Sequence, residues 1–453
     1  MKGIIQFLLI TLLLQNSSLS AQDKTWIGTS SDNWNTASNW NPNGVPSTTD
    51  EVDIPDVTND PKIPSILIVN IKSLTVKSGA KLTIQGNAIL NIKDAPLNGI
   101  LNEGTIENSG KININDIGGG GPDNSGIRNE GTFTNKPIAE IKMSNILNAG
   151  IRNYQTFNNA GKITIDPLYF LARGIIVFAA FHNQVGGDIQ IKGLSSGVVC
   201  FAPFTNDGKI VVSDYSSNGI VSQAGFNNTT MAQIFLEGGS WGIACNANTF
   251  TNEGKINIGA NAAPTIGIAV EGGNFNQFVN RGEINVYSAT KKGISIDDQA
   301  KFFNSGKINI GQNQIGEDGI ENFNIFENEA GAELTIHSAN QFSIENGNSL
   351  SDFSGMGNPP LPPAQFTNHP CAILRVKARI FNATNSTFTN KGFLFSEYQG
   401  NHSNQATFVN EGVIEDRHTA FNGNIDNQDI IIHSKSNCSN NVFTDVLQIG
   451  NNN

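Results

Sequence analysis

Charged residues and long apolar runs are scarce in this chain, and each shortage disfavours a class of protein. Only 15% of the residues are charged and the formal net charge is −11, which disfavours nucleic acid and anionic membrane surfaces as partners. After the N-terminus, no apolar run reaches the roughly 20 residues that a transmembrane helix needs. Glycine and asparagine are abundant instead, which suits stacked turns better than amphipathic helices. We therefore expect neither nucleic-acid binding nor a membrane span.

Residues 1–21 have the features of a secretory signal peptide. Met1-Lys2-Gly3 provides a charged start, the stretch from Ile4 to Leu14 is apolar, and small residues end at Ala21. The apolar stretch is too short to cross a bilayer. We expect cleavage after about Ala21 and a secreted or cell-surface location.

A Phe-x-Asn-x-Gly motif recurs along most of the sequence, as in Phe250-Thr251-Asn252-Glu253-Gly254. Its asparagines follow one another at intervals of about 24 residues: Asn135, Asn159, Asn183, Asn206, Asn228, Asn252, Asn280, Asn304 and Asn328. A Gly-(Ile/Val) pair precedes each motif and keeps the same pace, from Gly126 to Gly319. A repeat of this length is typical of a solenoid, in which each interval forms one coil.

The strands within each coil alternate with period two, as in Ile256-Asn257-Ile258, which excludes a helical repeat. A leucine ladder, which leucine-rich repeats require, is absent. The sequence therefore predicts an all-β protein, a single-stranded right-handed parallel β-helix with coils of about 24 residues.

The N-terminal motif Trp26-Ile27-Gly28, Asn33-Trp34, Ala37-Ser38-Asn39-Trp40, Val45-Pro46, Asp50 and Ile54-Pro55 carries a family resemblance. It resembles the start of secreted or autotransported β-helix proteins of Gram-negative bacteria in the pectin-lyase-like superfamily. The resemblance implies a right-handed parallel β-helix that begins here. Because the first coil exposes a sheet edge and the end of the core, we expect the tryptophans to cover that end. It also brings in polysaccharide lyases and glycoside hydrolases, because this superfamily contains both.

The repeat also predicts how the chain is divided. We expect a Trp-rich cap over residues 22–64, followed by a β-helix over residues 65–336. A Pro-rich insertion should then protrude over 337–366, before further coils at 367–433 and a tail or cap at 434–453.

The repeated asparagine has a structural interpretation. Asparagine tolerates the left-handed turn conformation, and its amide can bond the stacked copy in the next coil. We expect an inward ladder that includes Asn159, Asn206, Asn252, Asn280 and Asn304 and that satisfies turn amides inside the core.

Cys200 and Cys245 each follow the glycine of their coil by three residues, so they share a phase two coils apart. That places them roughly 9.6 Å from each other, beyond the ~7 Å that a disulfide tolerates between Cα atoms. We expect two buried thiols. Cys371 and Cys438 lie outside the register, and their pairing stays open.

The outward row of the Gly-Ile sheet predicts a contact surface. Tyr154, Phe178 and Phe201 follow their glycines by four residues and should lie beside the outward residues Ile176, Val199 and Val221. Arg128 and Arg152 flank this run. An exposed apolar patch marks an interaction site, here for a polysaccharide or a surface protein. Two alternatives remain open: a loop covers the patch, or the local register differs.

The sequence shows no catalytic constellation. Asp297 and Asp298 form the best carboxylate pair for a glycoside hydrolase, but the Gly-His-Gly of pectin hydrolases is missing. The Gly-rich stretch 116–123 fits no calcium motif, and the six histidines show no zinc or Ser-His-Asp spacing. We expect no catalytic residue, metal or cofactor, and a non-catalytic, adhesin-like protein. The alternative is a polysaccharide lyase or glycoside hydrolase.

Overall fold

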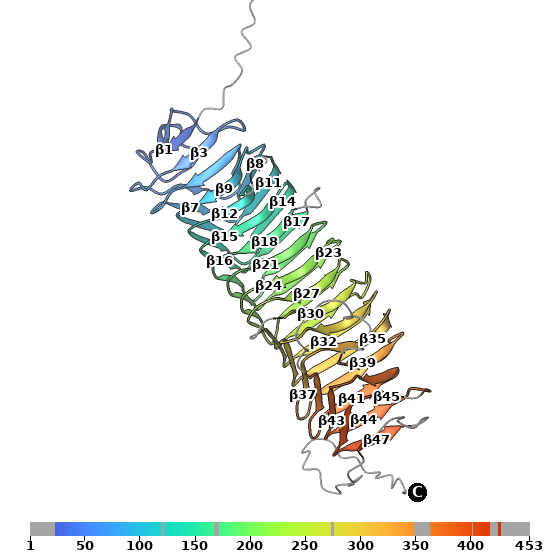
Figure 1. Ribbon diagram of the computed structural model, residues 1–453. Coiled ribbons are helices and arrows are strands. Elements are labelled where there is room, and N and C mark those ends of the chain that lie inside the picture. Colours follow the sequence, from blue (N-terminus) through green and yellow to red (C-terminus); the bar gives the residue numbers. More distant parts are fainter. Residues whose placement is uncertain are drawn as a thin grey trace, which may run out of the picture.

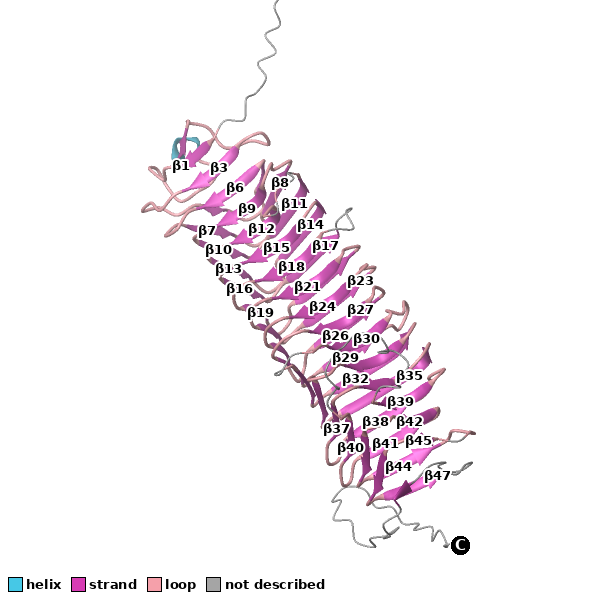
Figure 2. Cartoon of the chain, in the orientation of Figure 1, coloured by secondary structure: helices cyan, strands magenta, loops and turns pink. Residues whose placement is uncertain are grey.

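The computed structural model describes residues 23–118, 121, 123–166, 172–272, 276–347, 363–400, 402–416 and 425–426. Their strands are stacked into one elongated body (Figure 1). Nearly every described segment is either a strand or a short loop (Figure 2). Three sheets run the length of the stack, and almost all strand pairs are parallel. The predicted parallel β-solenoid with coils of about 24 residues is confirmed.

Sheet A contains the Gly-Ile strands and begins with the antiparallel pair β1–β2. Its strands are β1 (Lys24–Trp26), β2 (Trp40–Asn41), β3 (Glu51–Ile54), β6 (Ser73–Val76), β9 (Asn98–Asn102), β12 (Ser125–Asn129), β15 (Ala149–Asn153), β18 (Arg173–Val177), β21 (Ser196–Cys200), β24 (Asn218–Ser222), β27 (Trp241–Cys245), β30 (Ile266–Val270), β33 (Lys292–Ile296), β36 (Ile320–Asn322), β39 (Phe342–Asn346), β42 (Arg379–Asn382) and β45 (Ser403–Asn404). The repeated glycine is required by close packing: a Cβ at Gly174 would lie 2.4 Å from the Gly197 carbonyl oxygen.

Sheet B contains the Phe-x-Asn strands. They are β4 (Lys62–Ile63), β7 (Lys81–Ile84), β10 (Thr105–Asn108), β13 (Thr132–Asn135), β16 (Thr156–Asn159), β19 (Phe181–Asn183), β22 (Phe204–Asn206), β25 (Phe226–Asn228), β28 (Thr249–Asn252), β31 (Gln277–Asn280), β34 (Lys301–Asn304), β37 (Ile325–Asn328), β40 (Gln365–Asn368), β43 (Thr387–Asn390), β46 (Thr407–Asn410) and β48 (Ile425–Asp426). The phenylalanines point inward and their rings stack along the axis, with centroids 4.6–5.1 Å apart from Phe133 to Phe408.

Sheet C contains the Ile-x-Ile strands. They are β5 (Ile68–Ile71), β8 (Ile89–Lys93), β11 (Lys111–Ile117), β14 (Glu140–Ile146), β17 (Lys162–Asp166), β20 (Asp188–Lys192), β23 (Lys209–Ser213), β26 (Gln233–Glu237), β29 (Lys255–Ile258), β32 (Glu283–Ala289), β35 (Lys307–Ile315), β38 (Glu333–Ile336), β41 (Ile373–Val376), β44 (Phe393–Ser396) and β47 (Val413–Asp416). From β11 to β38, the residues that open these strands alternate in sign apart from Gln233, and several form lateral ion pairs, such as Lys255–Glu283 at 3.1 Å.

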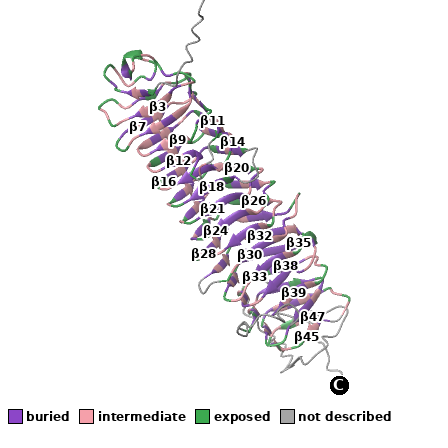
Figure 3. Cartoon of the chain, turned by 45° about the horizontal axis from the view of Figure 1, so that its top comes forward, coloured by how far each residue is buried: buried purple, intermediate pink, exposed green. Residues whose placement is uncertain are grey.

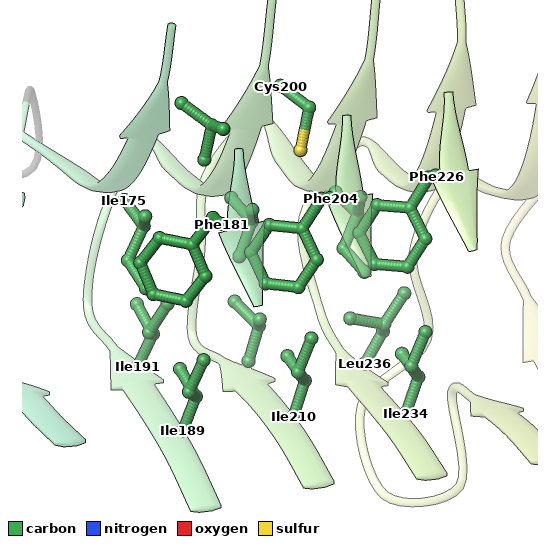
Figure 4. Packing of buried hydrophobic residues seen from close by; sticks show 14 of the residues in the cluster. Ile175, Phe181, Ile189, Ile191, Cys200, Phe204, Ile210, Phe226, Ile234 and Leu236 are labelled. Atoms are coloured by element: carbon green, nitrogen blue, oxygen red, sulfur yellow. The ribbon is translucent and has the colours of Figure 1, made fainter. Parts of the chain in front are cut away.

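The core is a continuous column enclosed by the three sheets (Figure 3). Figure 4 shows part of three successive coils: Phe181, Phe204 and Phe226 stack face to face, and isoleucines from sheet C pack against the rings. Cys200 points into the same space from sheet A. Each coil contributes the same kind of inward residues because its inward positions repeat.

The N-terminal end of the column is covered by Trp26, Trp34 and Trp40, which are fully buried. Trp40 meets the other two rings edge to face, at centroid distances of 4.9 and 4.7 Å. A single 3-10 turn, η1 (Ala37–Asn39), precedes Trp40. Strands β3 and β4 already belong to the stack, so the coils begin within the segment predicted to be the cap.

Part of the predicted insertion 337–366 also belongs to the stack, because β39 pairs with β36 and β42 in sheet A. Most of the Gly/Pro-rich stretch 355–363 lies outside the described residues, as do the predicted signal peptide and the predicted tail from residue 434. Among the residues that are described, no helix has the length and hydropathy that crossing a bilayer requires.

Candidate functional site

The outer face of sheet A has the register that the sequence predicts. Ile176 pairs laterally with Arg152 and Val199, and Val199 pairs with Val221. Val199, Val221 and Ala244 form an apolar cluster that is separate from the main core, with Trp241 packed against it. These residues therefore lie on the outer side of the sheet.

The rings of Tyr154, Phe178 and Phe201 form a regular outer stack, which we call the aromatic ladder. The Tyr154 and Phe178 ring centroids are 4.7 Å apart and those of Phe178 and Phe201 are 5.1 Å apart, with an interplanar angle of 6° in both pairs. Phe178 and Phe201 are 39% and 44% exposed. Neighbouring rings cover both faces of Phe178 and one face each of Tyr154 and Phe201, so Phe178 presents its ring edge to a partner.

The row beside the ladder is much less accessible than the sequence suggests. Ile176 is fully buried, and Val199 and Val221 are only 6% and 7% exposed. The accessible apolar surface therefore consists of the ladder and not of a broad patch.

The two arginines already have partners within the protein. Arg128 donates from Nε to Glu130 at 2.6 Å and lies over the Tyr154 ring, 4.9 Å from its centroid. Arg152 is only 7% exposed, donates to Asn148 and lies 3.9 Å from Asp123. Arg128 thus covers the outer face of the first ring, whereas Arg152 supports the sheet from a buried position.

The predicted asparagines form a hydrogen-bonded ladder inside the turn after sheet B. Each amide donates to the next, as Asn159 does through Asn183 to Asn206, at 2.7–2.8 Å. The run extends from Asn108 to Asn410. Nδ2 of Asn252 also contacts the carbonyl oxygens of Gly254 and Glu283, so the ladder satisfies turn carbonyls.

Sequence reasoning missed a second asparagine ladder at the end of the sheet A strands. Asn102 donates to Asn129, which donates to Asn153, and a further run connects Asn322, Asn346, Asn382 and Asn404. Between the two runs the same position holds Val177, Cys200, Ser222, Cys245, Val270 and Ile296. Asparagine three residues after the glycine of several coils was the available signal.

Sequence reasoning also missed a cluster of carboxylates farther along sheet A. Asp318, Glu321 and Glu345 bring oxygen atoms within 4.8 Å of one another. Lys292 forms an ion pair with Glu321, and Ser295 donates to Glu321 at 2.7 Å. The predicted pair Asp297–Asp298 lies in the neighbouring coil. The signal was a run of outward acids in successive coils, including Glu271, Asp297 and Glu321.

Burial and mutual repulsion disfavour full ionisation of this cluster. Burial, and then the charge of Glu321, raise the pKa of Asp318 to about 6. Burial also raises the pKa of Asp297, with a further contribution from Asp298. A carboxyl that stays protonated near neutral pH can act as a general acid. However, Asp318 and Glu321 are only 3% and 6% exposed, so a polysaccharide in solvent has little access to their carboxylates.

The prediction for Cys200 and Cys245 is confirmed: both thiols are free and buried, with Ser222 in the coil between them. Burial raises the pKa of Cys245 to about 12 and that of Cys200 as well. Neither thiol is therefore a nucleophile at neutral pH. Cys371 takes part in a disulfide, and Cys438 lies outside the described residues, so the question of their pairing, which the sequence left open, is not tested by the described residues.

Comparison with known proteins gives one family match. A family model described as "Domain of unknown function (DUF8693)" matches residues 25–137. This range includes the tryptophan cap and the first coils. No curated protein and no solved structure matches the chain.

Proposed function

We propose that this protein is a non-catalytic, adhesin-like solenoid of the cell surface or extracellular space that binds a protein partner along the aromatic ladder of sheet A. The main observation in support is the ladder itself. Phe178 and Phe201 are 39% and 44% exposed, and their rings stack in register on the outer face of the sheet. The N-terminal signal-like segment supports export. A stacked β-solenoid supports the role because it holds a surface site on a long, stiff body.

The geometry of the ladder favours a protein over a glycan. A sugar ring packs against the face of an aromatic ring, but the faces of Tyr154 and Phe178 are occupied by neighbouring rings and by Arg128. Ring edges can contact the aliphatic and aromatic side chains of a protein surface instead. The low accessibility of Arg152 also removes one of the two cations that an acidic polysaccharide would need.

The carboxylate cluster supports a second candidate, a glycoside hydrolase or lyase. The observation in favour of this candidate is the group formed by Asp318, Glu321 and Glu345, in which the pKa of Asp318 is raised to about 6. This candidate ranks second because Glu321 is neutralised by Lys292 and the acids are mostly buried.

The binding proposal is tested with arrays of purified extracellular proteins and of neutral and acidic polysaccharides. The variant Phe178→Ser/Phe201→Ser should lose retention on protein spots. Val185→Ser is the matched control, because Val185 is 77% exposed outside the ladder. The proposal fails if retention occurs on glycan spots alone or is unchanged in the double variant.

The enzyme candidate is tested on the same polysaccharides by measuring new reducing ends and unsaturated products. The catalytic candidate would replace the binding proposal if the wild-type protein forms products and Glu321→Gln does not. The circular dichroism spectrum of the variant must be unchanged for this conclusion. The enzyme candidate would be excluded if no products form under conditions in which the protein still binds its protein spots.

A further inference from the structure

The first strand of sheet C has an open side. Strand β5 is the terminal strand of this sheet, and β8 is its partner in the described chain. Leu67 directs its carbonyl toward β8, where Ile89 donates to it at 2.9 Å, whereas Lys72 donates in the other direction, to Asp50. Because backbone groups alternate along a strand, the N–H and C=O groups of Ile68 and Asn70 point away from β8.

The cap does not pair with this open side, for a reason in its sequence. Pro42 and Pro46 have no N–H to give to a strand ladder. The following residues close a turn on themselves: Ser47 donates its backbone N–H to Asp50 Oδ2 at 2.7 Å, and Asp50 donates to the Ser47 carbonyl. Sheets A and B are continued into the cap by β1 and by the bridge between Asn33 and Lys62, but sheet C is not.

An amide ladder on the outer face of sheet C also ends at β5. Asn113 donates to Asn91 at 2.9 Å, and Asn91 donates to Asn70 at 2.8 Å. The donors all point toward the N-terminal end. Asn70 is therefore the last rung, and its own Nδ2 group faces the place where another strand would supply the next acceptor.

A cavity of about 250 Å³ lies between the cap and this edge. Trp34 and Pro46 from the cap line it on one side, and Ile68, Val69 and Asn70 from β5 line it on the other. Trp34 is fully buried, and its indole N–H has no acceptor within the described part of the chain. The volume is below the roughly 300–1,000 Å³ of small-molecule sites, so it suits a short length of extended chain better than a compact ligand.

The edge keeps apolar residues that a solvent-facing edge normally avoids. Ile66 is 82% exposed and Ile68 is 56% exposed. Ile66 has a φ of 65° at a turn position where other coils place Asn87, Ile138 or Gly186 in the same conformational region, so this conformation belongs to the repeat. Ile68 lies on the strand itself, and an exposed apolar residue on an edge strand invites another strand.

We propose that the edge of β5 is a strand-addition site for an extended peptide segment of a partner protein with the pattern apolar–Asn–apolar. The backbone of the segment pairs with Ile68 and Asn70. Its asparagine accepts from Asn70 Nδ2 on the outer face, and its apolar side chains enter the cavity beside Val69 and Trp34. This is the pattern of the chain's own sheet C strands, such as Ile256-Asn257-Ile258, and of β-strand addition in general.

The test uses the full chain and a synthetic peptide with the sequence of residues 253–260. Binding is followed by the indole ¹H–¹⁵N resonance of Trp34, assigned with Trp34→Phe. We expect saturable displacement of this resonance. A peptide in which Asn257 is replaced by leucine should bind about tenfold more weakly, because the outer rung is lost.

Ile68→Pro is the main protein variant, because the Ile68 N–H points to the open side and its removal spares the pairing with β8. It should abolish the displacement while leaving the thermal midpoint near that of the wild type. Asn70→Leu is the second variant and should weaken binding about tenfold.

Three outcomes overturn the proposal. The first is no displacement at millimolar peptide, and the second is equal displacement in wild type and Ile68→Pro. The third is concentration-dependent assembly of the wild type that Ile68→Pro removes, which would identify a second copy of this chain as the occupant. If Ile68→Pro still binds the protein spots of the array, the strand-addition site is distinct from the aromatic ladder on sheet A, and failure of one proposal can be told from failure of the other.

Discussion

The two asparagine ladders of this protein lie in different turns, one after the sheet A strands and one after the sheet B strands, and they differ in continuity. The sheet B ladder runs unbroken from Asn108 to Asn410. The sheet A ladder stops at Asn153 and resumes at Asn322, with apolar, thiol and hydroxyl side chains between. Both turns must satisfy inward carbonyls, so the difference shows that asparagine is one solution among several.

The interruption coincides with the apolar outer surface of sheet A. Val177 precedes Phe178 and Cys200 precedes Phe201, so the same coils are apolar on both faces. In this region Ser222 bonds the Ala224 carbonyl, and Cys245 Sγ lies 3.7 Å from the Gln277 carbonyl. Where the ladder resumes, the outer face carries the carboxylate cluster instead. The two parts of sheet A thus present different chemistry on one backbone.

The largest effect should come from breaking the continuous ladder. Asn252→Val leaves the amide of Asn228 without its acceptor and the oxygen of Asn280 without its donor. We expect a loss of about 2–4 kcal/mol in the free energy of unfolding. Urea unfolding followed by circular dichroism measures it. A loss below that of the conservative control Ile258→Val, about 0.5–1.5 kcal/mol, would contradict a structural role for the ladder.

An asparagine introduced into the interruption of the sheet A ladder should lower the free energy of unfolding. The loss should be larger in the middle of the interruption than at its end. Val270→Asn has Cys245 and Ile296 as lateral neighbours, and we expect a loss of about 2–3 kcal/mol. Ile296→Asn lies beside Asn322 and can extend the second run, so its loss should be about 1 kcal/mol smaller. Equal midpoints in parallel urea titrations would show that neighbouring rungs do not cooperate.

The carboxylate cluster should make stability depend on pH. Asp318 has a pKa raised from 3.8 to about 6, so the folded state binds its proton more tightly than the unfolded state. Its contribution is fully present below the unfolded pKa and is lost as pH rises through the folded pKa. Allowing for contact with water, we expect a loss of about 1–2 kcal/mol across this window.

Asp318→Asn isolates this contribution, because other carboxyls titrate in both proteins. Its stability relative to the wild type should therefore rise from the acidic to the neutral end of the window. A constant difference between the two urea midpoints would show that Asp318 ionises normally.

The smallest effect concerns the thiols that interrupt the sheet A ladder. Cys200 and Cys245 should resist alkylation by iodoacetamide in the native protein, because both are buried and their pKa values are raised. Both should react fully in urea. Native labelling detected by mass spectrometry would show that the interrupted segment of sheet A opens locally.

The residues of the aromatic ladder show how far the candidate site could be predicted from the sequence. The period of two places Phe178 and Phe201 on the outer face, and the stacking in register follows from the equal phase of their coils. Their exposure does not follow, and neither does the near-complete burial of Val199 beside them. Accessibility depends on every neighbouring side chain and loop, including those distant in sequence.

Repetition is what allowed the sequence alone to determine the fold, the core positions and the sheet B ladder. Each inward Phe, Ile and Asn recurs at one phase, so a single coil specifies all the others. The tertiary structure decided features that break the repeat: the carboxylates gathered from Asp318 and Glu345, the engagement of Arg152, and the open edge at Ile68. These features depend on which non-repeating residues meet across coils and at the end of the stack. A periodic sequence pattern specifies neither the distances between such residues nor their burial.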